Sequence, residues 1–232
     1  MRVLFIFEDG ERSSFFVYKL HGRDNALIRV SPEVPLKGIT LGMLYTKVDI
    51  KKFLYYFSTA FAIEVTKYLI LKKSDSLLAI AEAGLENDRK MSVYSPKSFV
   101  SEKTGTAFVA GEQRLTLKEI EAYIEYQVDR DGKMDVFERQ EDIIRLMKRK
   151  TVRPSLSSVT KHYGTVKEFS GSNLNLKDML KMGTGYLAKG SAHMKKEMIP
   201  AEGSYQLSKD FPYRVIRIDW EKNPYALKKE FR

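Results

Sequence analysis

The stretch that decides the fold is Ala110–Arg153, with the sequence AGEQRLTLKEIEAYIEYQVDRDGKMDVFERQEDIIRLMKRKTVR. It predicts two helices joined by a charged, glycine-containing turn. Thr116 and Glu119 have the spacing of a capping box, in which each side chain accepts a hydrogen bond from the other residue's amide. Asp135 is placed to cap the second helix. Both helices carry apolar side chains at helical spacing, so each has a face to bury.

The remaining segments predict a sheet covered by helices. The first three predicted strands are separated by short polar turns, which favours antiparallel pairing. The predicted strands are Arg2–Phe7, Ser14–Leu20, Ala26–Val30, Ala62–Leu71, Ser92–Tyr94, Thr106–Val109, Met194–Ile199 and Tyr213–Asp219. The predicted helices outside the central pair are Leu41–Tyr45, Asp49–Phe61, Ser74–Ala83, Ser155–Tyr163, Asn175–Leu187 and Pro224–Phe231. The prediction is an α/β (α+β) fold, a three-layer sandwich with a central mixed sheet, in a single domain over residues 1–232.

The composition restricts the class of protein. Lys and Arg number 40 and Asp and Glu 30, which gives a net charge of +10. Such an excess indicates either an anionic partner or simply a solvated basic surface. The chain has no cysteine, which excludes disulfides and thiolate metal sites. No apolar run has the length of a membrane span, and the opening Met1–Glu8 is too short for a signal peptide.

Familiar nucleotide and metal motifs are absent from the sequence. There is no Walker pattern, and Gly183-Thr184-Gly185 lacks the third glycine of a dinucleotide-binding turn. The three histidines are widely separated and belong to no metal-binding motif. The basic residues between Arg145 and Arg153 fit either an anion-binding rim or a helix end whose dipole they complement. The polar groups at the junction of the central helices, Arg130, Arg139 and Gln140, are therefore the first candidates for chemistry.

Several segments together follow the pattern of one known family. Gly111, Leu115 and Glu121–Gln127 follow a late motif that ends in Tyr-x-Arg-x-Arg, and Glu138-Arg139-Gln140 matches a final Arg-Gln pair. The outline agrees at Val3–Leu20, Ala81–Leu85 and Leu174–Leu180. On these residues the chain resembles the LytR-CpsA-Psr family of Gram-positive cell-envelope proteins.

The resemblance implies a function outside the cytoplasm. Members are membrane-anchored phosphotransferases that move anionic glycopolymers, such as teichoic acid or capsule, from a polyprenyl-pyrophosphate carrier to peptidoglycan. The resemblance implies an apolar pocket for the lipid, arginines that clamp the pyrophosphate and a divalent cation (Mg²⁺) held by aspartate. It also implies location at the extracytoplasmic face of a bacterial membrane, through an anchor that this sequence does not contain.

The chain departs from the family pattern at the positions that should hold the phosphates. The resemblance implies a charged residue, Arg or Asp, at each of six positions that are Ser13, Glu33, Val34, Glu125, Gln127 and Val136 here. Glu125 reverses the charge that faces a pyrophosphate, which would repel it by a few kcal/mol at an effective dielectric of about 20. The retained candidates are Asp9 and Arg139 as catalytic residues, with Asp9 also as metal ligand. The candidates for ligand binding are Arg139, Gln140, Arg130, Arg12 and Tyr126.

Three hypotheses follow. The first is a divergent member that binds a polyprenyl-linked phosphate or an anionic glycopolymer and has largely lost its catalytic clamp. The second is an active phosphotransferase with a rebuilt site, in which Arg12, Arg130 and Arg139 clamp the phosphates and Asp9 holds the metal with Glu8 or Glu33. The third, which ranks last because no recognition motif accompanies the basic charge, is a nucleic-acid-binding regulator.

Overall fold

A computed structural model of the chain describes residues 1–20, 25–151, 171–178, 181, 195–225 and 227–231. The chain divides into two compact units. The sheet unit contains Met1–Lys72, Ser155–Gln206 and Val215–Arg232, and the helix-pair unit contains Lys73–Pro154 and Leu207–Arg214. Several sequence features lie outside the described residues: the predicted helix Ser155–Tyr163, most of the predicted helix Asn175–Leu187, the Gly183–Gly185 segment, and the histidines His21, His162 and His193.

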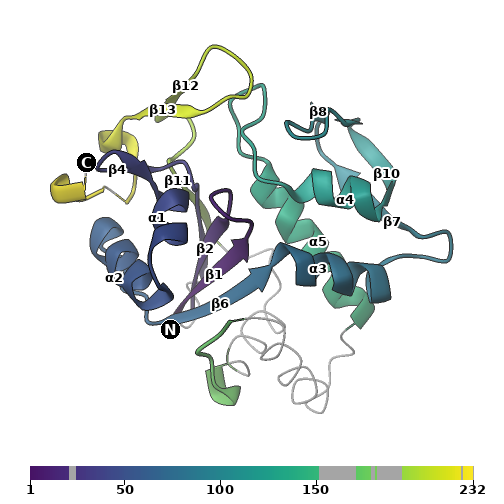
Figure 1. Cartoon of the computed structure of the whole chain (residues 1–232), viewed down its shortest axis with the longest axis horizontal. Helices are drawn as coiled ribbons and strands as arrows, with labels where there is room; N and C mark the ends of the chain where they lie inside the picture. The colour runs from purple at the N-terminus through teal and green to yellow at the C-terminus, as the bar shows by residue number, and fades with distance from the viewer. Residues whose placement is uncertain (21–24, 152–170, 179–180, 182–194, 226, 232) are drawn as a thin grey trace. The chain divides into compact units, whose positions relative to one another are not determined.

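The sheet unit is built on five strands in the order β11-β3-β2-β1-β6 (Figure 1). They are β1 (Arg2–Glu8), β2 (Ser14–Lys19), β3 (Ala26–Val30), β6 (Lys67–Lys72) and β11 (Lys195–Ile199). As their short connections predict, β1, β2 and β3 pair antiparallel. The edge strands β6 and β11 pair parallel with β1 and β3. The predicted α/β fold with a central mixed sheet is therefore confirmed.

Two helices cover one face of this sheet, α1 (Leu41–Lys47) and α2 (Ile50–Phe61). Each begins where a side chain accepts from the first amides of the helix. The Thr40 hydroxyl accepts from the amide of Met43 at 3.2 Å, and Asp49 Oδ1 accepts from two amides at 3.0 Å. Phe53 of α2 is fully buried against the sheet, which explains why the aromatic stripe of this helix belongs to the core.

The outer edge of β6 is paired with a short segment from late in the chain. The Ile70 amide donates to the Gly171 carbonyl at 2.7 Å, and the Tyr68 amide donates to the Asn173 side chain at 2.8 Å. The Ser172 hydroxyl donates back to the Tyr68 carbonyl at 3.1 Å. Both amides and the carbonyl on this side of β6 therefore have partners.

The helix-pair unit contains the stretch from which the fold was predicted. Its elements are α3 (Lys73–Ala79), the π-helical turn η1 (Ile80–Gly84), β7 (Lys90–Ser95), β8 (Phe99–Val100), β9 (Ala107–Phe108), β10 (Gly111–Thr116), α4 (Leu117–Ile124) and α5 (Val136–Thr151). The predicted capping box is present, because the Thr116 hydroxyl accepts from the Glu119 amide and the Glu119 carboxylate accepts from the Thr116 amide at 2.7 Å. The helix α5 begins at the predicted place, directly after Asp135.

Several predicted elements were wrong. The stretch predicted as the strand Ala62–Leu71 becomes regular only at Lys67, because Ala62 ends α2 in a left-handed conformation and the chain must turn before it can pair. The predicted helix Pro224–Phe231 is only a 3₁₀ turn, η4 (Lys229–Phe231), after a first such turn η3 (Trp220–Lys222). Leu227 is buried there and the Lys228 amide donates to the Ala60 carbonyl, so the chain follows the end of α2 instead of coiling.

Five short strands were missed: β4, β5, β8, β10 and β12. In the sheet unit β4 (Pro35–Leu36) pairs with β5 (Ile39–Thr40). The strand β12 (Tyr205–Leu207) pairs with β13 (Val215–Ile218). In the helix-pair unit β8 lies within a segment predicted as loop, and β10 pairs antiparallel with β7. The strand β10 has only one buried side chain, Leu115, so its sequence lacks the alternation by which a strand is recognised. Among the described residues no helix has both the length and the apolar character to cross a bilayer.

Candidate functional site

The candidate site lies where α4 leads into α5, within the helix-pair unit. The chain leaves α4 at Glu125 in an extended conformation and turns back before α5. Glu125, Gln127 and Asp129 are buried although all three are polar. Arg139 and Gln140, in the first turns of α5, are each 3% exposed. Buried polar groups of this kind must find partners inside the protein, and their contacts define the site.

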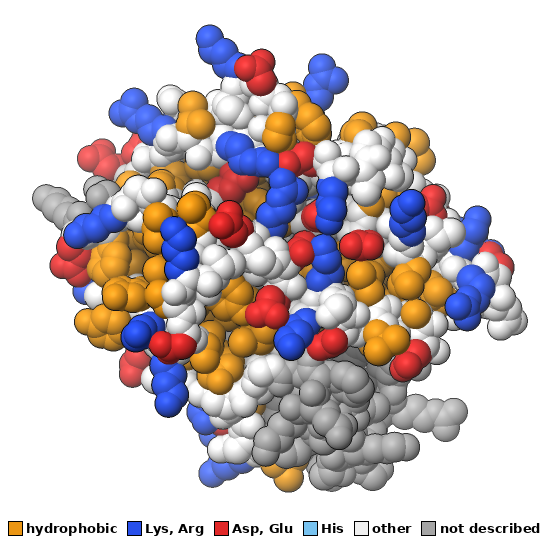
Figure 2. All heavy atoms as spheres, viewed as in Figure 1, with side chains coloured by type: hydrophobic (Ala, Val, Ile, Leu, Met, Phe, Trp, Pro, Cys, Tyr) orange, Lys and Arg blue, Asp and Glu red, His pale blue; other side chains and the backbone are white. Residues whose placement is uncertain are grey.

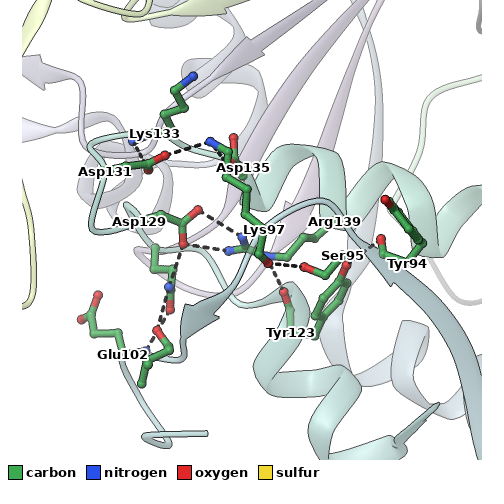
Figure 3. Close-up of polar contacts among 12 residues, drawn as sticks. Tyr94, Ser95, Lys97, Glu102, Tyr123, Asp129, Asp131, Lys133, Asp135 and Arg139 are labelled. Atoms are coloured by element: carbon green, nitrogen blue, oxygen red, sulfur yellow. Dashed lines mark hydrogen bonds and ion pairs between the residues drawn. The ribbon is translucent and has the colours of Figure 1, made fainter. Parts of the chain in front are cut away.

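Arg139 is surrounded by partners (Figure 3). Its Nη1 lies 3.1 Å from Asp129 Oδ2 and its Nη2 lies 3.5 Å from Asp129 Oδ1, which makes a forked ion pair. Its Nε donates to the Tyr123 carbonyl at 2.9 Å. The guanidinium also lies 3.8 Å from the centre of the Phe99 ring. Arg139, which the resemblance assigns to the phosphate clamp, is thus neutralised by an internal carboxylate.

Gln127, at a position where the resemblance implies an arginine, completes this network. Its Nε2 donates to Asp129 Oδ1 and to the Val100 carbonyl, each at 3.0 Å. Its Oε1 accepts from the Glu102 amide at 2.8 Å. A neutral amide therefore holds the carboxylate that pairs with Arg139, where the resemblance implies a second cation.

Glu125, the charge-reversed position, has its own cation. Its carboxylate lies 3.1 Å from Lys103 Nζ, and its side chain is only 6% exposed. The pair accounts for a buried carboxylate that would otherwise be costly. This ion pair links the loop that contains Lys103 to the end of α4.

The other predicted residues of this unit have mainly structural contacts. Gln140 Nε2 donates to the Ile124 carbonyl at 2.8 Å, which ties α5 to the last turn of α4. Tyr126 is buried, with its hydroxyl 3.6 Å from Met134 Sδ. Val136 is fully buried. Arg130 is exposed and lines the pocket described next.

A pocket of about 770 Å³ opens beside this network, and we call it the arginine pocket. It is lined by residues 95–100, 107–109 and 127–131 and by Asp135, Arg139, Phe211 and Tyr213. Its ionisable side chains are three cations, Lys97, Arg130 and Arg139, and three carboxylates, Asp129, Asp131 and Asp135. The lining therefore has formal net charge zero.

Lys97 joins two of the pocket carboxylates (Figure 3). Its Nζ lies 2.8 Å from Asp131 Oδ2 and 3.1 Å from Asp135 Oδ2. The hydrogen bond to Asp131 is the main reason that the pKa of Lys97 is raised, so this lysine stays charged. With Arg139 paired to Asp129, two of the three pocket cations are engaged by pocket carboxylates.

The remaining predicted site residues belong to the sheet unit. They lie at the turn after β1, where the Asp9 amide donates to Ser13 Oγ at 3.0 Å and Ser13 Oγ donates to the Gly10 carbonyl at 2.6 Å. The Arg12 amide donates to the Asp9 carbonyl at 3.1 Å. Ser13, at a position where the family has an aspartate, thus closes a tight turn.

The other carboxylates proposed as metal ligands are engaged elsewhere in the sheet unit. Glu8 accepts from the Tyr45 hydroxyl at 2.5 Å, and Glu33 accepts from the Val215 amide at 2.8 Å. Val34 is a fully buried core residue. In the part of the chain that the structure describes, no group of three or more acidic or histidine side chains is placed to hold a cation. Because magnesium is commonly held by one or two protein carboxylates together with substrate phosphates and water, Asp9 as a metal ligand stays a prediction.

Sequence reasoning missed much of the arginine pocket. Phe99, Lys97, Tyr213 and Phe211 come from segments that carried no motif, and only the folded chain brings them to Arg139. Asp129 lies directly before the candidate Arg130, but no motif marks it as a site residue. An acidic residue ten positions before a buried arginine offers no periodic signal of pairing.

The charge excess is spread over the surface on the face seen in Figure 2. There, Lys and Arg side chains are interspersed with Asp and Glu over most of the described surface. This distribution agrees with a solvated basic surface on this face.

Comparison with known proteins identifies the family. The sequence pattern of the LytR_cpsA_psr family matches residues 45–228. A comparison with curated proteins returns no match. Similar solved structures include TagV of B. subtilis, with a TM-score of 0.66 at 18% identity over 93% of this chain and 89% of that chain. TagU of B. subtilis gives a TM-score of 0.58 at 16% identity over 93% and 88%.

A further structure agrees over almost the whole chain. The LytR-Csp2A-Psr enzyme from Actinomyces oris gives a TM-score of 0.62 at 15% identity over 99% of this chain and 91% of that chain. At these identities the likeness shows a shared fold, while the sequence match covers more than half of the chain. The chain therefore belongs to the LytR_cpsA_psr family, which is associated with the glycopolymers of the cell envelope.

Proposed function

We propose that this chain is a divergent family member that binds an anionic cell-envelope glycopolymer or its polyprenyl-phosphate carrier and has lost most of the phosphotransfer machinery. Domains of the family are in general extracytoplasmic, and we place the binding there, with peptidoglycan and the membrane as neighbours. The observation that carries the proposal is the ion pair between Arg139 and Asp129.

The ion pair matters because phosphoryl transfer depends on positioned positive charge. An arginine clamp stabilises the charge that develops on the transferred phosphoryl group. Arg139 offers little of this, since an internal carboxylate already neutralises it and three of its N–H groups are engaged. The positions of two family arginines carry Glu125 and Gln127, one paired with a lysine and the other bound to backbone groups.

The alternative, an active transferase, would depend on the few predicted site residues that are not neutralised in the arginine pocket. Arg130 is exposed at the pocket and would have to supply the cation, together with Arg12 of the sheet unit. Asp9 would have to supply a carboxylate to a divalent ion whose other ligands are substrate phosphates and water. These observations favour binding over transfer.

The test measures binding and turnover on the same protein. Native mass spectrometry of the whole chain with short polyprenyl phosphates, and calorimetric titration with a soluble teichoic acid fragment, should both detect complexes. An assay for release of the pyrophosphate-linked lipid in the presence of Mg²⁺ should detect no turnover. Metal-dependent release by the unaltered chain, reduced in Arg139→Ala, would instead establish the transferase.

A pair of surface variants controls for general charge effects. Arg130→Ala removes an exposed cation at the pocket, and Arg145→Ala removes a half-exposed cation of α5 that is paired with Asp142 and lies outside the pocket lining. If the pocket takes part in binding, the first substitution should weaken polymer binding and the second should not. Equal losses would indicate attraction by net charge alone.

A further inference from the structure

The arginine pocket is bordered by a short arm of the chain, Leu207–Arg214, that belongs to the helix-pair unit. The arm is a closed hairpin, since the Ser208 amide donates to the Arg214 carbonyl and the Arg214 amide donates to Ser208 Oγ, each at 2.9 Å. Arg214 also forms an ion pair with Glu102, elsewhere in the same unit. Its Nη1 lies 2.8 Å from Glu102 Oε2, and its Nη2 contacts Glu102 Oε1. The arm is thus held in place at its base.

This anchored arm presents two aromatic rings to the pocket. Phe211 and Tyr213 both line it, with ring centres 5.8 Å apart and planes at 80°. Phe211 is 53% exposed. Its ring is therefore open to a ligand that enters the pocket.

The charged side chains of the pocket lining carry no net positive charge. Asp129, Asp131 and Asp135 balance Lys97, Arg130 and Arg139, so a pyrophosphate would meet no net positive charge there. Ionised carboxylates accept through about four lone-pair sites each, and a guanidinium donates through five N–H groups. Since Arg139 and Asp129 are occupied by each other, sugar hydroxyl groups would use the remaining lone pairs of Asp131 and Asp135 and the N–H groups of the exposed Arg130.

We propose that the arginine pocket binds uncharged sugar rings of a glycopolymer, with one ring against Phe211 and Tyr213 and its hydroxyl groups toward the pocket carboxylates and Arg130. This inference rests on the proposed function and specifies its ligand: the pocket contacts the sugars of the chain, and the phosphates bind elsewhere. A volume of about 770 Å³ lies within the range of small-ligand sites, roughly 300–1,000 Å³.

The test is a titration of the whole chain followed by amide NMR. The probes are neutral tetrasaccharides of glucose, galactose, N-acetylglucosamine and N-acetylgalactosamine, and separately sodium pyrophosphate. At least one tetrasaccharide should shift the amide signals of residues 107–109 and 211–213, and pyrophosphate should not. Phe211→Ala should weaken the binding of that tetrasaccharide about fivefold to tenfold, as expected for a lost aromatic contact of about 1 kcal/mol.

Tyr94→Ala is the matched control. Tyr94 is 61% exposed on β7 of the same unit and does not line the pocket, so its loss should leave sugar binding unchanged. The proposal is overturned if none of the four tetrasaccharides shifts these signals, or if pyrophosphate shifts them at lower concentration. It is also overturned if Tyr94→Ala and Phe211→Ala weaken binding equally.

The two proposals fail in different ways. If polyprenyl phosphate or the teichoic acid fragment binds while the sugar probes leave the pocket signals unmoved, the sugar subsite is refuted and the proposed function stands. If a neutral sugar binds at the pocket while neither polymer nor carrier binds, the proposed function fails and the sugar subsite remains.

Discussion

Replacement of Asp129 by asparagine is the sharpest perturbation that the site offers. The substitution keeps the shape of the side chain and removes its charge. Arg139 would then be a cation that is 3% exposed, with only the Tyr123 carbonyl, the Phe99 ring and one amide oxygen as partners. The structure therefore predicts that Asp129→Asn lowers the free energy of unfolding of the helix-pair unit.

The size of the loss follows from the geometry. At 3.1 Å and an effective dielectric of about 20, the two charges attract by about 5 kcal/mol. Removal of one partner of a buried pair generally costs about 3–5 kcal/mol, because the other charge is left uncompensated. Since asparagine can still accept one hydrogen bond from Arg139, we expect a loss of about 3 kcal/mol.

The assay is urea denaturation of four proteins: the unaltered chain, Asp129→Asn, Arg139→Met and the double variant. The double variant should lose less than the sum of the single losses, by about 2 kcal/mol or more, because it removes both members of the pair. The folded Asp129→Asn variant should also bind pyrophosphate more tightly than the unaltered chain, since the pocket gains one net positive charge. Strictly additive losses, or an unchanged affinity for pyrophosphate, would refute the reasoning.

Three further predictions concern stability and are checked by thermal and urea denaturation. Gly42→Ala should cost about 3 kcal/mol or more, because the added Cβ would lie 1.9 Å from the Glu11 carbonyl oxygen; a variant as stable as the parent would contradict the close contact. Thr116→Ala should cost about 1 kcal/mol, and less at low pH. The amide and hydroxyl of Thr116 lower the pKa of Glu119 below 4.5, so the stabilisation is present above that pH and is lost as the pH falls through the folded-state value; an undiminished loss at pH 3 would argue against the capping box. Phe53→Ala should cost about 3–5 kcal/mol, as expected for a fully buried aromatic side chain, and a loss below 1 kcal/mol would place Phe53 outside the core.

The parts of the fold that the sequence predicts are those determined by local chemistry. The capping box at Thr116 and Glu119 depends on two side chains three positions apart, and both of its hydrogen bonds are present. The first three strands follow from short turns between apolar runs. In contrast, the stretch Pro224–Phe231 has helical spacing, but the burial of Leu227 holds it in another path.

The candidate site was harder to predict because its chemistry depends on partners distant in the sequence. Motif comparison selected Arg139, which lines the arginine pocket, and its role there stays a prediction. The same comparison gave no sign that Asp129 neutralises it, because the pairing exists only once α5 packs against the end of α4. The sequence comparison shows only that Gln127 is not an arginine. The structure shows that its side chain binds Asp129, the Val100 carbonyl and the Glu102 amide.

The short segment beside β6 has a consequence for solubility. The strand reads Lys-Tyr-Leu-Ile-Leu-Lys, an apolar run with a lysine at each end, and such a strand at an open edge would pair with other copies of the chain. Gly171, Ser172 and Asn173 occupy the groups through which that pairing would begin. The flanking lysines add a second barrier, since stacked copies would bring like charges together. Gly171, Ser172 and Asn173 of the same chain thus shield this edge strand from pairing with other copies.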